Sequence, residues 1–202
     1  MLVLGITGGI GMGKSTAAAI LYKLGIESVD SDALAREASG IGKPGYWEIL
    51  ERFRDQSIVD TDGTINRGRL AKIVFNDSGA LKDLEAILHP RIRRAWEEWL
   101  DRQRESGKRA AAVLIPLLFE KAYDSYFDVA IAVGCGPGTQ KQRLLSRGWD
   151  DAQIGARNAA QLALVDKMKR AKYVIWTEGA ISTHEKQWVA TLANLGLTCC
   201  PA

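Results

Sequence analysis

The stretch "GITGGIGMGKST" (residues 5–16) decides the fold, because it packs five glycines into its first nine positions and then places a lysine. Glycine loses more backbone freedom on ordering than any other residue, so this density is costly inside a helix or a strand. Residues 8–15 match the pattern G-x-x-x-x-G-K-[ST], which is a phosphate-binding loop. The context fits, since an apolar strand-like run precedes the loop and a helical pattern, Ser15–Leu24, follows it.

Each position of this loop has a physical role in holding a nucleotide. Residues without a Cβ let backbone N–H groups turn inward around a phosphate, and the start of the following helix adds its positive dipole end. We expect Lys14 to reach the β- and γ-phosphates of ATP and Ser15 to ligate Mg²⁺. The loop residues expected to bind the nucleotide are Gly8, Gly9, Ile10, Gly11, Met12, Gly13, Lys14, Ser15 and Thr16. The alternative is a glycine-rich turn without a ligand.

Composition bounds the class of protein. The 202 residues suit one domain, with 47% hydrophobic and 25% charged residues, as in soluble globular proteins. A net charge of +3 with interleaved signs does not argue for nucleic acid as a partner. The three cysteines, Cys135, Cys199 and Cys200, form neither a zinc pattern nor a disulfide framework. No signal peptide or membrane span stands out, so we expect a cytoplasmic protein and favour a monomer.

Short apolar runs alternate with helical patterns along the chain. Near-continuous hydrophobicity without polar alternation is typical of strands buried on both faces of a sheet. The expected strands are Leu2–Ile6, Ile26–Val29, Ala111–Ile115, Val129–Val133 and Tyr173–Trp176. This pattern predicts an α/β fold of the P-loop NTPase type, with three layers and a mainly parallel five-stranded sheet.

Two helical insertions interrupt the expected core, which comprises residues 1–32, 109–135 and 172–202 of a single domain. The first, residues 33–108, is expected to contain the helices Pro44–Arg54, Arg67–Phe75 and Leu81–Arg104 and to bind the acceptor. In the last of these helices, Trp96 and Trp99 recur at helical spacing and are expected to pack in a core or a domain interface. Pro90 marks a kink or a new first turn, because it has no N–H to donate. The second insertion, residues 136–171, is expected to form a lid.

Asp32 lies at the end of the second expected strand, where the phosphate loop also lies. A carboxylate there can accept a proton from a substrate hydroxyl or bind Mg²⁺ through water. The alternative is that Asp32 caps a helix beginning at Ala33, a role that aspartate serves well. Arg36 follows one helical turn later and is expected to face the same cleft.

Other charged residues are less decisive. The third strand leads into Pro116 and its first acid is Glu120, so the aspartate that often holds magnesium at this strand end is absent. Arg143 and Arg147 are four residues apart, hence on one helix face, where they would clamp phosphates or remain solvated. His89 precedes a cluster of arginines that would meet a polyphosphate or lie exposed: Arg91, Arg93 and Arg94.

Taken in order, these segments resemble the dephospho-coenzyme A kinase family. The resemblance spans nearly the whole chain. It rests on "TGGIGMGKST" (7–16), "LGIESVDSDALAR" (24–36), "DGTINRGRLAKIVF" (62–75), "LHPRIR" (88–93), "PLLFE" (116–120), "TQKQRLLSR" (139–147) and "RNAAQLALVDKMKRAKYVI" (157–175). A phosphate loop alone is unspecific, whereas ordered motifs of this number are specific.

The resemblance implies transfer of the γ-phosphoryl group of ATP to the 3′-hydroxyl of dephospho-coenzyme A, the last step of coenzyme A synthesis. It implies that Gly11–Thr16 bind ATP and that Asp32 acts as the base on the ribose hydroxyl. The acceptor would face Arg36, His89, Leu117 and Glu120, and Arg143 and Arg147 would belong to the lid.

The sequence departs from the family pattern at a few positions. Gly134 and Cys135 replace an acidic or bulkier residue. Lys172 replaces an aspartate and "WTEG" (176–179) replaces an asparagine-rich turn, and these last two departures put the nucleotide preference in doubt. Two other classes compete with a kinase of this family. A GTPase would explain Asp60–Gly63, which spells D-x-x-G, but no N-K-x-D follows. A different small-molecule kinase of the same fold would leave "PLLFE" and "LHPRIR" without a role.

Overall fold

A computed structural model describes residues 1–197 of the chain. The chain divides into two compact units, one formed by Met1–Asp30 with the segment from Gln103 onward, the other by Ser31–Arg102. The C-terminal cysteines, Cys199 and Cys200, lie outside the described residues. None of the helices between residues 1 and 197 combines the length and the apolar character that a membrane crossing requires.

The first unit is built on a five-stranded sheet in the order β2-β3-β1-β4-β5, and every adjacent pair is parallel. The predicted parallel sheet is confirmed, and each predicted strand agrees with the structure to within one residue at either end. The strands are β1 Leu2–Thr7, β2 Glu27–Asp30, β3 Ala110–Leu114, β4 Val129–Gly134 and β5 Tyr173–Trp176. The strand that carries the phosphate loop, β1, is therefore the central one.

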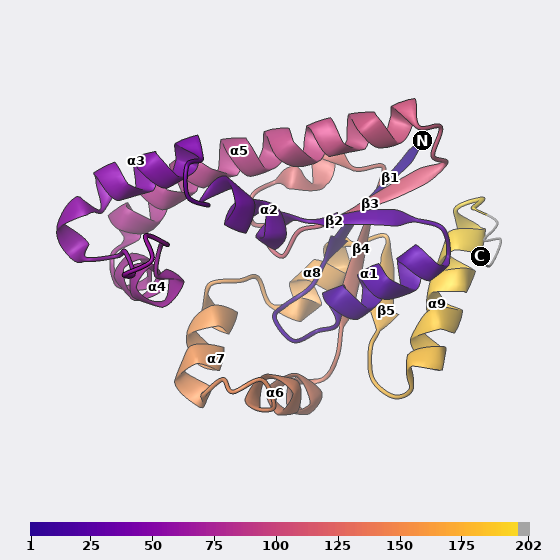
Figure 1. Ribbon diagram of the computed structural model, residues 1–202. Helices are drawn as coiled ribbons and strands as arrows, with labels where there is room; N and C mark the ends of the chain where they lie inside the picture. The colour runs from indigo at the N-terminus through magenta and orange to yellow at the C-terminus, as the bar shows by residue number, and fades with distance from the viewer. Residues whose placement is uncertain (198–202) are drawn as a thin grey trace. The chain divides into compact units, whose positions relative to one another are not determined.

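Apolar side chains explain why the three inner runs form buried strands, whereas the edge strand β2 is half-buried along its length. Every residue of β3 is buried, as a continuous apolar run without polar alternation predicts. Helices α1 Lys14–Lys23 and α9 Ile181–Asn194 lie beside the sheet (Figure 1). The main core includes Leu21 of α1 and Trp188 and Leu192 of α9. The helices of this unit are α1 Lys14–Lys23, α6 Pro137–Leu145, α7 Asp151–Ala159, α8 Leu164–Arg170 and α9 Ile181–Asn194, with a 3₁₀ turn at Tyr123–Tyr126.

The second unit is helical, as predicted for this insertion. Its helices are α2 Ser31–Ala38, α3 Pro44–Arg52, α4 Arg67–Asn76 and α5 Ser78–Glu105, with a 3₁₀ turn at Arg54–Gln56; the last three residues of α5 belong to the first unit. A separate core holds this unit together and includes Ile49, Phe53, Leu70 and Val74.

One of the two alternatives for Pro90 is wrong. Pro90 does not begin a new helix, because α5 runs from Ser78 to Glu105 with Pro90 inside it. Proline removes one hydrogen bond of the helix and crowds the preceding turn, which costs about 3 kcal/mol. Packing on both sides of this position offsets that cost, since Leu84, Ile87 and Leu88 pack against the core of the unit and Trp96 is buried.

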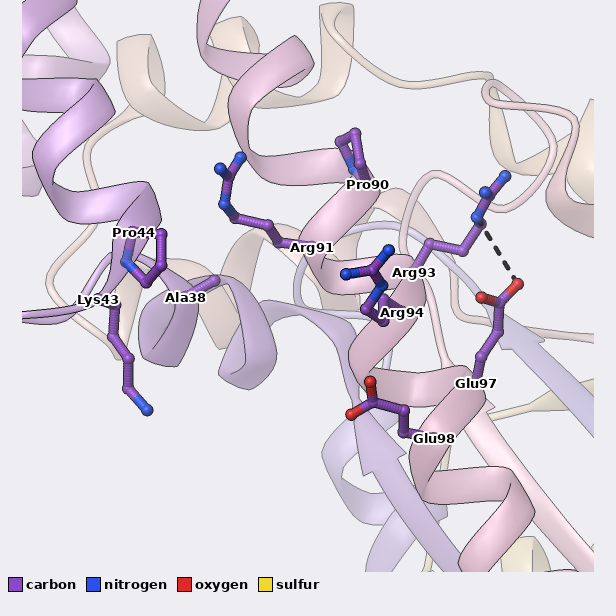
Figure 2. Close-up of a pocket in the computed structure, with 9 residues that line it drawn as sticks. All are labelled: Ala38, Lys43, Pro44, Pro90, Arg91, Arg93, Arg94, Glu97 and Glu98. Carbon is purple, nitrogen blue, oxygen red and sulfur yellow. Dashed lines mark ion pairs between the residues drawn. The ribbon is translucent and has the colours of Figure 1, made fainter.

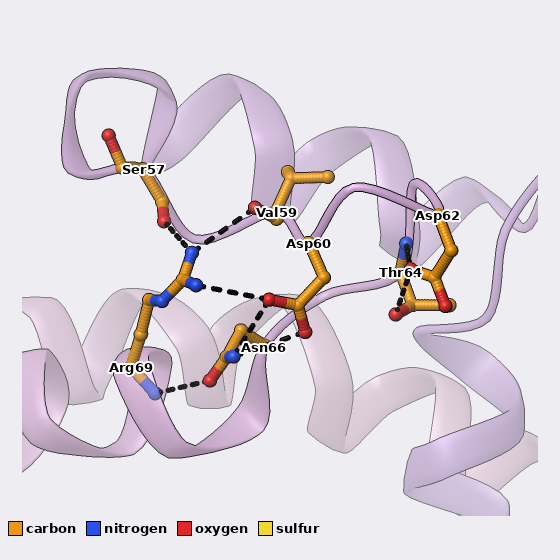
Figure 3. A network of polar contacts seen from close by, with 7 residues as sticks. All are labelled: Ser57, Val59, Asp60, Asp62, Thr64, Asn66 and Arg69. Atoms are coloured by element: carbon orange, nitrogen blue, oxygen red, sulfur yellow. Dashed lines mark hydrogen bonds and ion pairs between the residues drawn. The ribbon is translucent and has the colours of Figure 1, made fainter.

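The D-x-x-G sequence at Asp60–Gly63 forms a structural turn. The Asp62 carboxylate accepts bonds from the backbone N–H and the hydroxyl of Thr64, at 2.9 and 2.7 Å, which lowers the pKa of Asp62. Asp60 binds the Asn66 amide and pairs with Arg69 at 3.2 Å, and Asn66 caps α4 (Figure 3). Because both carboxylates are engaged within the turn, the sequence match to a GTPase motif has a structural explanation.

Candidate functional site

The phosphate loop joins the central strand β1 to helix α1, and its glycines are required by close contacts. Gly8 adopts a φ of 154°, and a Cβ on it would lie 2.3 Å from the carbonyl oxygen of Val133 in β4. Gly11 has a φ of 68° and a Cβ there would lie 2.9 Å from the side chain of Leu144 in α6. The loop therefore lies against strand β4 and helix α6, and neither Gly8 nor Gly11 has room for a side chain.

Lys14 is the first residue of α1 and folds back over the loop. Its Nζ donates to the carbonyl oxygens of Gly8 at 2.7 Å and Gly9 at 3.0 Å. Ser15 lies in the first turn of the same helix and is exposed. An ammonium group, a hydroxyl and the N-terminus of a helix thus converge on one loop, which is the arrangement that binds the phosphates of a nucleotide.

Three side chains from distant parts of the chain hold the carbonyl groups of this loop. Gln140 Nε2 donates to the oxygen of Ile10 at 2.9 Å, and Thr177 Oγ1 donates to that of Met12 at 3.0 Å. Arg143 Nη1 donates to the oxygen of Gly11, at the longer distance of 3.4 Å. A phosphate is repelled by carbonyl oxygens and attracted by N–H groups. Engaging three carbonyls with donors therefore favours a loop whose N–H groups serve the anion.

The two arginines predicted to share a helix face have different surroundings. Arg143 lies in α6 and also donates to Thr177, at 3.0 Å to its hydroxyl and at short range to its carbonyl oxygen. Helix α6 ends at Leu145, so Arg147 lies beyond it and is exposed. The expectation that both lie on one helix face is wrong, because Ser146 and Gly148 continue the chain as a turn and break the helical spacing.

Glu178 ties the end of β5 to the beginning of α6. Its Oε1 accepts from the backbone N–H of Gly136 at 2.7 Å and from the Thr139 hydroxyl at 2.9 Å. Its Oε2 accepts from the indole N–H of Trp176 at 3.1 Å. The bond from Gly136, followed by those from Thr139 and Trp176, lowers the pKa of Glu178. The "WTEG" stretch, which departs from the family pattern, is thus a hydrogen-bonded turn beside the phosphate loop.

A buried ion pair lies beyond the end of β3, where an aspartate was not found. Lys167 of α8 has no exposed side-chain surface, and its Nζ lies 2.7 Å from Glu120 Oε1, whose side chain is 14% exposed. The ammonium also donates to the carbonyl oxygen of Pro116, which accepts in addition from the Thr7 hydroxyl at 3.1 Å. The pair therefore fastens the "PLLFE" turn to the end of β1, next to the phosphate loop.

Burial and the charge of Glu120 shift the pKa of Lys167 in opposite directions. Burial lowers the pKa of Lys167, and the hydrogen bond and charge of Glu120 raise it in part. Glu120 Oε1 accepts a further bond from the backbone N–H of Leu162 at 2.8 Å. Within the described residues, its Oε2 is buried and has no hydrogen-bond partner. Leu117 is half-buried in the same turn.

In the second unit, Asp32 is the second residue of α2 and is exposed. A helix that begins at Ser31 leaves no place for Asp32 as its cap, so the capping alternative is wrong. Arg36 lies one turn later, on the same face of α2 as Asp32. His89 is half-buried in α5.

The arginines that follow His89 line a basic groove of about 770 Å³, which we define by Ala38, Lys43, Pro44, Pro90, Arg91, Arg93, Arg94, Glu97 and Glu98. Figure 2 shows the three arginines projecting from α5 around this groove. Arg91 pairs with Glu48, and Arg93 pairs with Glu97 at 3.6 Å. Part of the positive charge of the groove is therefore balanced by acids of the same unit.

Within residues 1–197, no three side chains of the His, Cys, Asp or Glu type lie close enough to hold a metal ion by themselves. Magnesium usually takes one or two protein ligands together with phosphate oxygens and water. The exposed Ser15 hydroxyl at the start of α1 fits that mode of binding.

Comparison with known proteins identifies one family along nearly the whole chain. The sequence model of the dephospho-CoA kinase family matches residues 2–183. The chain belongs to the dephospho-CoA kinase family. A dephospho-CoA kinase of Lactobacillus johnsonii is 36% identical over 96% of this chain and 98% of its own length. A solved protein from Thermus thermophilus is similar with a TM-score of 0.83 and 34% identity, covering 96% of this chain and 97% of that one. The fold of a dephospho-CoA kinase from Campylobacter jejuni is also similar, with a TM-score of 0.62, 24% identity and 96% of each chain covered.

Sequence reasoning missed three residues that shape the site of this family member. Gln140, Lys167 and Thr177 all lie in segments that carried or bordered the resemblance to dephospho-CoA kinases. The sequence alone does not distinguish a buried glutamine or lysine from an exposed one, and the residues around these positions are polar and basic. The signal that was available is the place of Gln140 three residues before Arg143 on one helix face.

Proposed function

We propose that this chain phosphorylates the 3′-hydroxyl of dephospho-coenzyme A with ATP as the donor. The observation that carries the proposal is the family match over residues 2–183 on a chain whose phosphate loop is complete. The nucleotide-binding residues are those of the loop from Gly8 to Thr16. Members of this family use ATP, and phosphoryl transfer depends on positioning and charge compensation more than on covalent chemistry.

On the donor side, Lys14 moves from the carbonyls of Gly8 and Gly9 to the β- and γ-phosphates when a nucleotide fills the loop. An ammonium group gains more from phosphate oxygens than from neutral carbonyls. Ser15 would hold Mg²⁺, which neutralises charge on the transferred group. Arg143 and Arg147 belong to the lid of residues 136–171 and compensate charge on the phosphates.

On the acceptor side, Asp32 takes the proton of the 3′-hydroxyl as that oxygen attacks phosphorus. Its exposed place in the first turn of α2 leaves the carboxylate within reach of a ligand. Arg36, His89, Leu117 and Glu120 contribute to the binding of the acceptor. For Glu120, the contribution is through the "PLLFE" turn, because its carboxylate is engaged by Lys167 and by Leu162.

The proposal is tested by measuring ADP release with Mg·ATP and dephospho-coenzyme A, and by locating the new phosphate on the product by NMR. We expect turnover that depends on the acceptor. Shikimate and free nucleosides serve as competing acceptors in the same assay. No acceptor-dependent turnover with dephospho-coenzyme A, or faster turnover with one of the others, would contradict the proposal. The monomeric state that we propose is checked by light scattering at the assay concentration.

The role of Asp32 is tested by Asp32→Asn, with Glu37→Gln as the control on the same helix. Both variants remove one negative charge from an exposed position of α2. We expect Asp32→Asn to lower kcat by about 10²- to 10⁴-fold, as removal of a general base does, and to leave ATP binding unchanged. Equal kcat values for the two variants would return Asp32 to a surface role.

A further inference from the structure

Helix α6 begins without a side-chain cap of its own. Its N-cap residue, Gly136, has no side chain, and its first turn, "PGTQ" (137–140), contains no acid. The N-terminus of a helix has unpaired backbone N–H groups and a partial positive charge. Glu178, 42 positions after Gly136, supplies an acceptor and a negative charge there. Its Oε1 accepts from the N–H of Gly136 at 2.7 Å and from the hydroxyl of Thr139 at 2.9 Å.

Gly136 gives independent evidence for this contact. Its φ of −63° and ψ of 157° are values that any residue adopts, so the backbone does not require glycine here. A Cβ on Gly136 would lie 2.7 Å from Glu178 Oε1, a separation that real Cβ atoms essentially never show. Beyond the chain neighbours of Gly136, the other described atom within 4 Å is Cδ of the same Glu178 side chain, at 3.7 Å. Glycine at this position therefore admits the carboxylate.

Glu178 is itself held in the turn that follows β5. Its Oε2 accepts from the indole N–H of Trp176 at 3.1 Å. Its carbonyl oxygen lies 3.3 Å from Nε2 of the buried His184, and this ring nitrogen is the donor, because a carbonyl oxygen only accepts. The preceding residue, Thr177, donates to the Met12 oxygen of the phosphate loop at 3.0 Å. The acid that contacts the start of α6 thus projects from a turn that also supports the loop.

Two side chains of α6 also support the phosphate loop. Gln140 directly follows Thr139, and its Nε2 donates to the Ile10 oxygen at 2.9 Å. Arg143 follows about one turn later and donates to the Gly11 oxygen at 3.4 Å. Because a helix is a stiff element, a displacement of its first turn also displaces both donors relative to the loop.

We propose that Glu178 is a positioning residue for nucleotide binding, which fixes the first turn of α6 and thereby places Gln140 and Arg143 on the phosphate loop. The inference rests on the proposed function only in taking ATP as the nucleotide. The hydrogen bonds of the carboxylate lower the pKa of Glu178, so the group stays charged at neutral pH. The "WTEG" stretch that contains Glu178 departs from the family pattern, so the contact is a feature of this chain.

The test measures the Kd of a non-hydrolysable ATP analogue with Mg²⁺ by calorimetry, without an acceptor. We expect Glu178→Ala to raise this Kd by about three- to thirtyfold, because Gln140 and Arg143 lose their fixed positions. Glu178→Gln keeps an oxygen for Gly136 and loses the charge, so its Kd should lie between those of Glu178→Ala and the wild type. Glu185→Ala is the matched control, since it removes an acid of the same unit that pairs with Lys23 at 3.2 Å.

A second pair of variants displaces the carboxylate and keeps it in the chain. Gly136→Ala should raise the Kd as Glu178→Ala does. Gly138→Ala should leave it unchanged, since a Cβ there meets no described atom within 4 Å beyond its chain neighbours. If Gly136 and Glu178 act through one contact, the double variant should bind the analogue as Glu178→Ala alone does.

The last variants separate a role through α6 from a general loss of stability. In a chain that carries Gln140→Leu and Arg143→Ala, adding Glu178→Ala should change the Kd by less than about twofold. Amide hydrogen exchange in Glu178→Ala should be faster in α6 and unchanged in β1.

Two results would overturn the inference. One is that Glu178→Ala and Gly136→Ala bind the analogue as their controls do. The other is that Glu178→Ala weakens binding by the same factor with and without Gln140 and Arg143. A wild type that binds the analogue but does not phosphorylate dephospho-coenzyme A contradicts the proposed function alone, because this Kd is measured without the acceptor.

Discussion

The buried pair of Lys167 and Glu120 gives the sharpest prediction for stability. Lys167→Met removes the ammonium group and keeps most of the volume of its side chain. Glu120 then remains 86% buried and keeps its bond from the N–H of Leu162, and the carbonyl oxygen of Pro116 keeps its bond from Thr7. Removing one partner of a buried ion pair costs about 3–5 kcal/mol, because it leaves an uncompensated charge inside the protein.

This loss is large enough to measure in two independent ways. At about 2–4 °C per kcal/mol for a chain of this size, the melting temperature should fall by roughly 6–20 °C. Urea unfolding followed by circular dichroism and by tryptophan fluorescence gives the free energy, and coincident transitions justify its two-state treatment. Trp188 in the core of the first unit reports on the same unit as the pair.

The double variant tests the reason for the loss. Glu120→Gln alone leaves the ammonium of Lys167 unpaired, and we expect a similar cost. Combining Lys167→Met with Glu120→Gln removes both charges, so the double variant should be more stable than the sum of the single losses predicts, by at least about 2 kcal/mol. Single variants within about 0.5 kcal/mol of the wild type, or strictly additive losses, would refute the argument that the two charges depend on each other.

Four further outcomes follow from the site. Gly8→Ala should destabilise the chain by about 1–3 kcal/mol and abolish ATP binding, because its Cβ would lie 2.3 Å from the Val133 oxygen; unchanged calorimetric titrations would contradict this. Gln140→Leu keeps the size of the side chain but loses its bonds to Ile10 and to Asn158 at 3.0 Å, so we expect a higher KM for ATP at a nearly unchanged melting temperature. Arg143→Ala should lower kcat with little loss of stability, and an equal rate would make Arg143 a structural side chain alone. Burial lowers the pKa of Lys167 in the folded chain below its usual 10.5. Just below pH 10.5, Lys167 is therefore protonated more often in the unfolded chain than in the folded one. The free energy of unfolding of the wild type, measured relative to that of Lys167→Met, should rise with pH in that window.

Much of the fold could be predicted because its signals are local. Uninterrupted apolar runs fixed the five strands to within one residue, and the glycine-rich loop fixed where the first strand ends. Pro90 shows where local reasoning stops. A proline penalty is a property of the helix alone, whereas the packing that offsets it comes from residues elsewhere in the unit.

The candidate site was predictable in its motifs and less so in its contacts. The loop from Gly8 to Thr16 was identified from the sequence because its glycines and its lysine are adjacent in the chain. The donors to its carbonyl oxygens are Gln140 and Arg143 of α6 and Thr177 after β5, and no local sequence pattern predicts these bonds. Arg147 illustrates the same limit, since the end of α6 at Leu145 depends on where the next turn can pack.

The bond from Thr177 to Met12 joins residues 165 positions apart, and that from Gln140 to Ile10 joins residues 130 apart. The loop is therefore synthesised well before its neighbours in the sheet, β3 and β4, and before the side chains that support it. During synthesis the loop therefore lacks its hydrogen bond from Thr177 until the chain beyond strand β5 has been made. A nascent chain arrested before Thr177 should therefore fail to retain nucleotide, because its phosphate loop lacks the donor to the Met12 carbonyl.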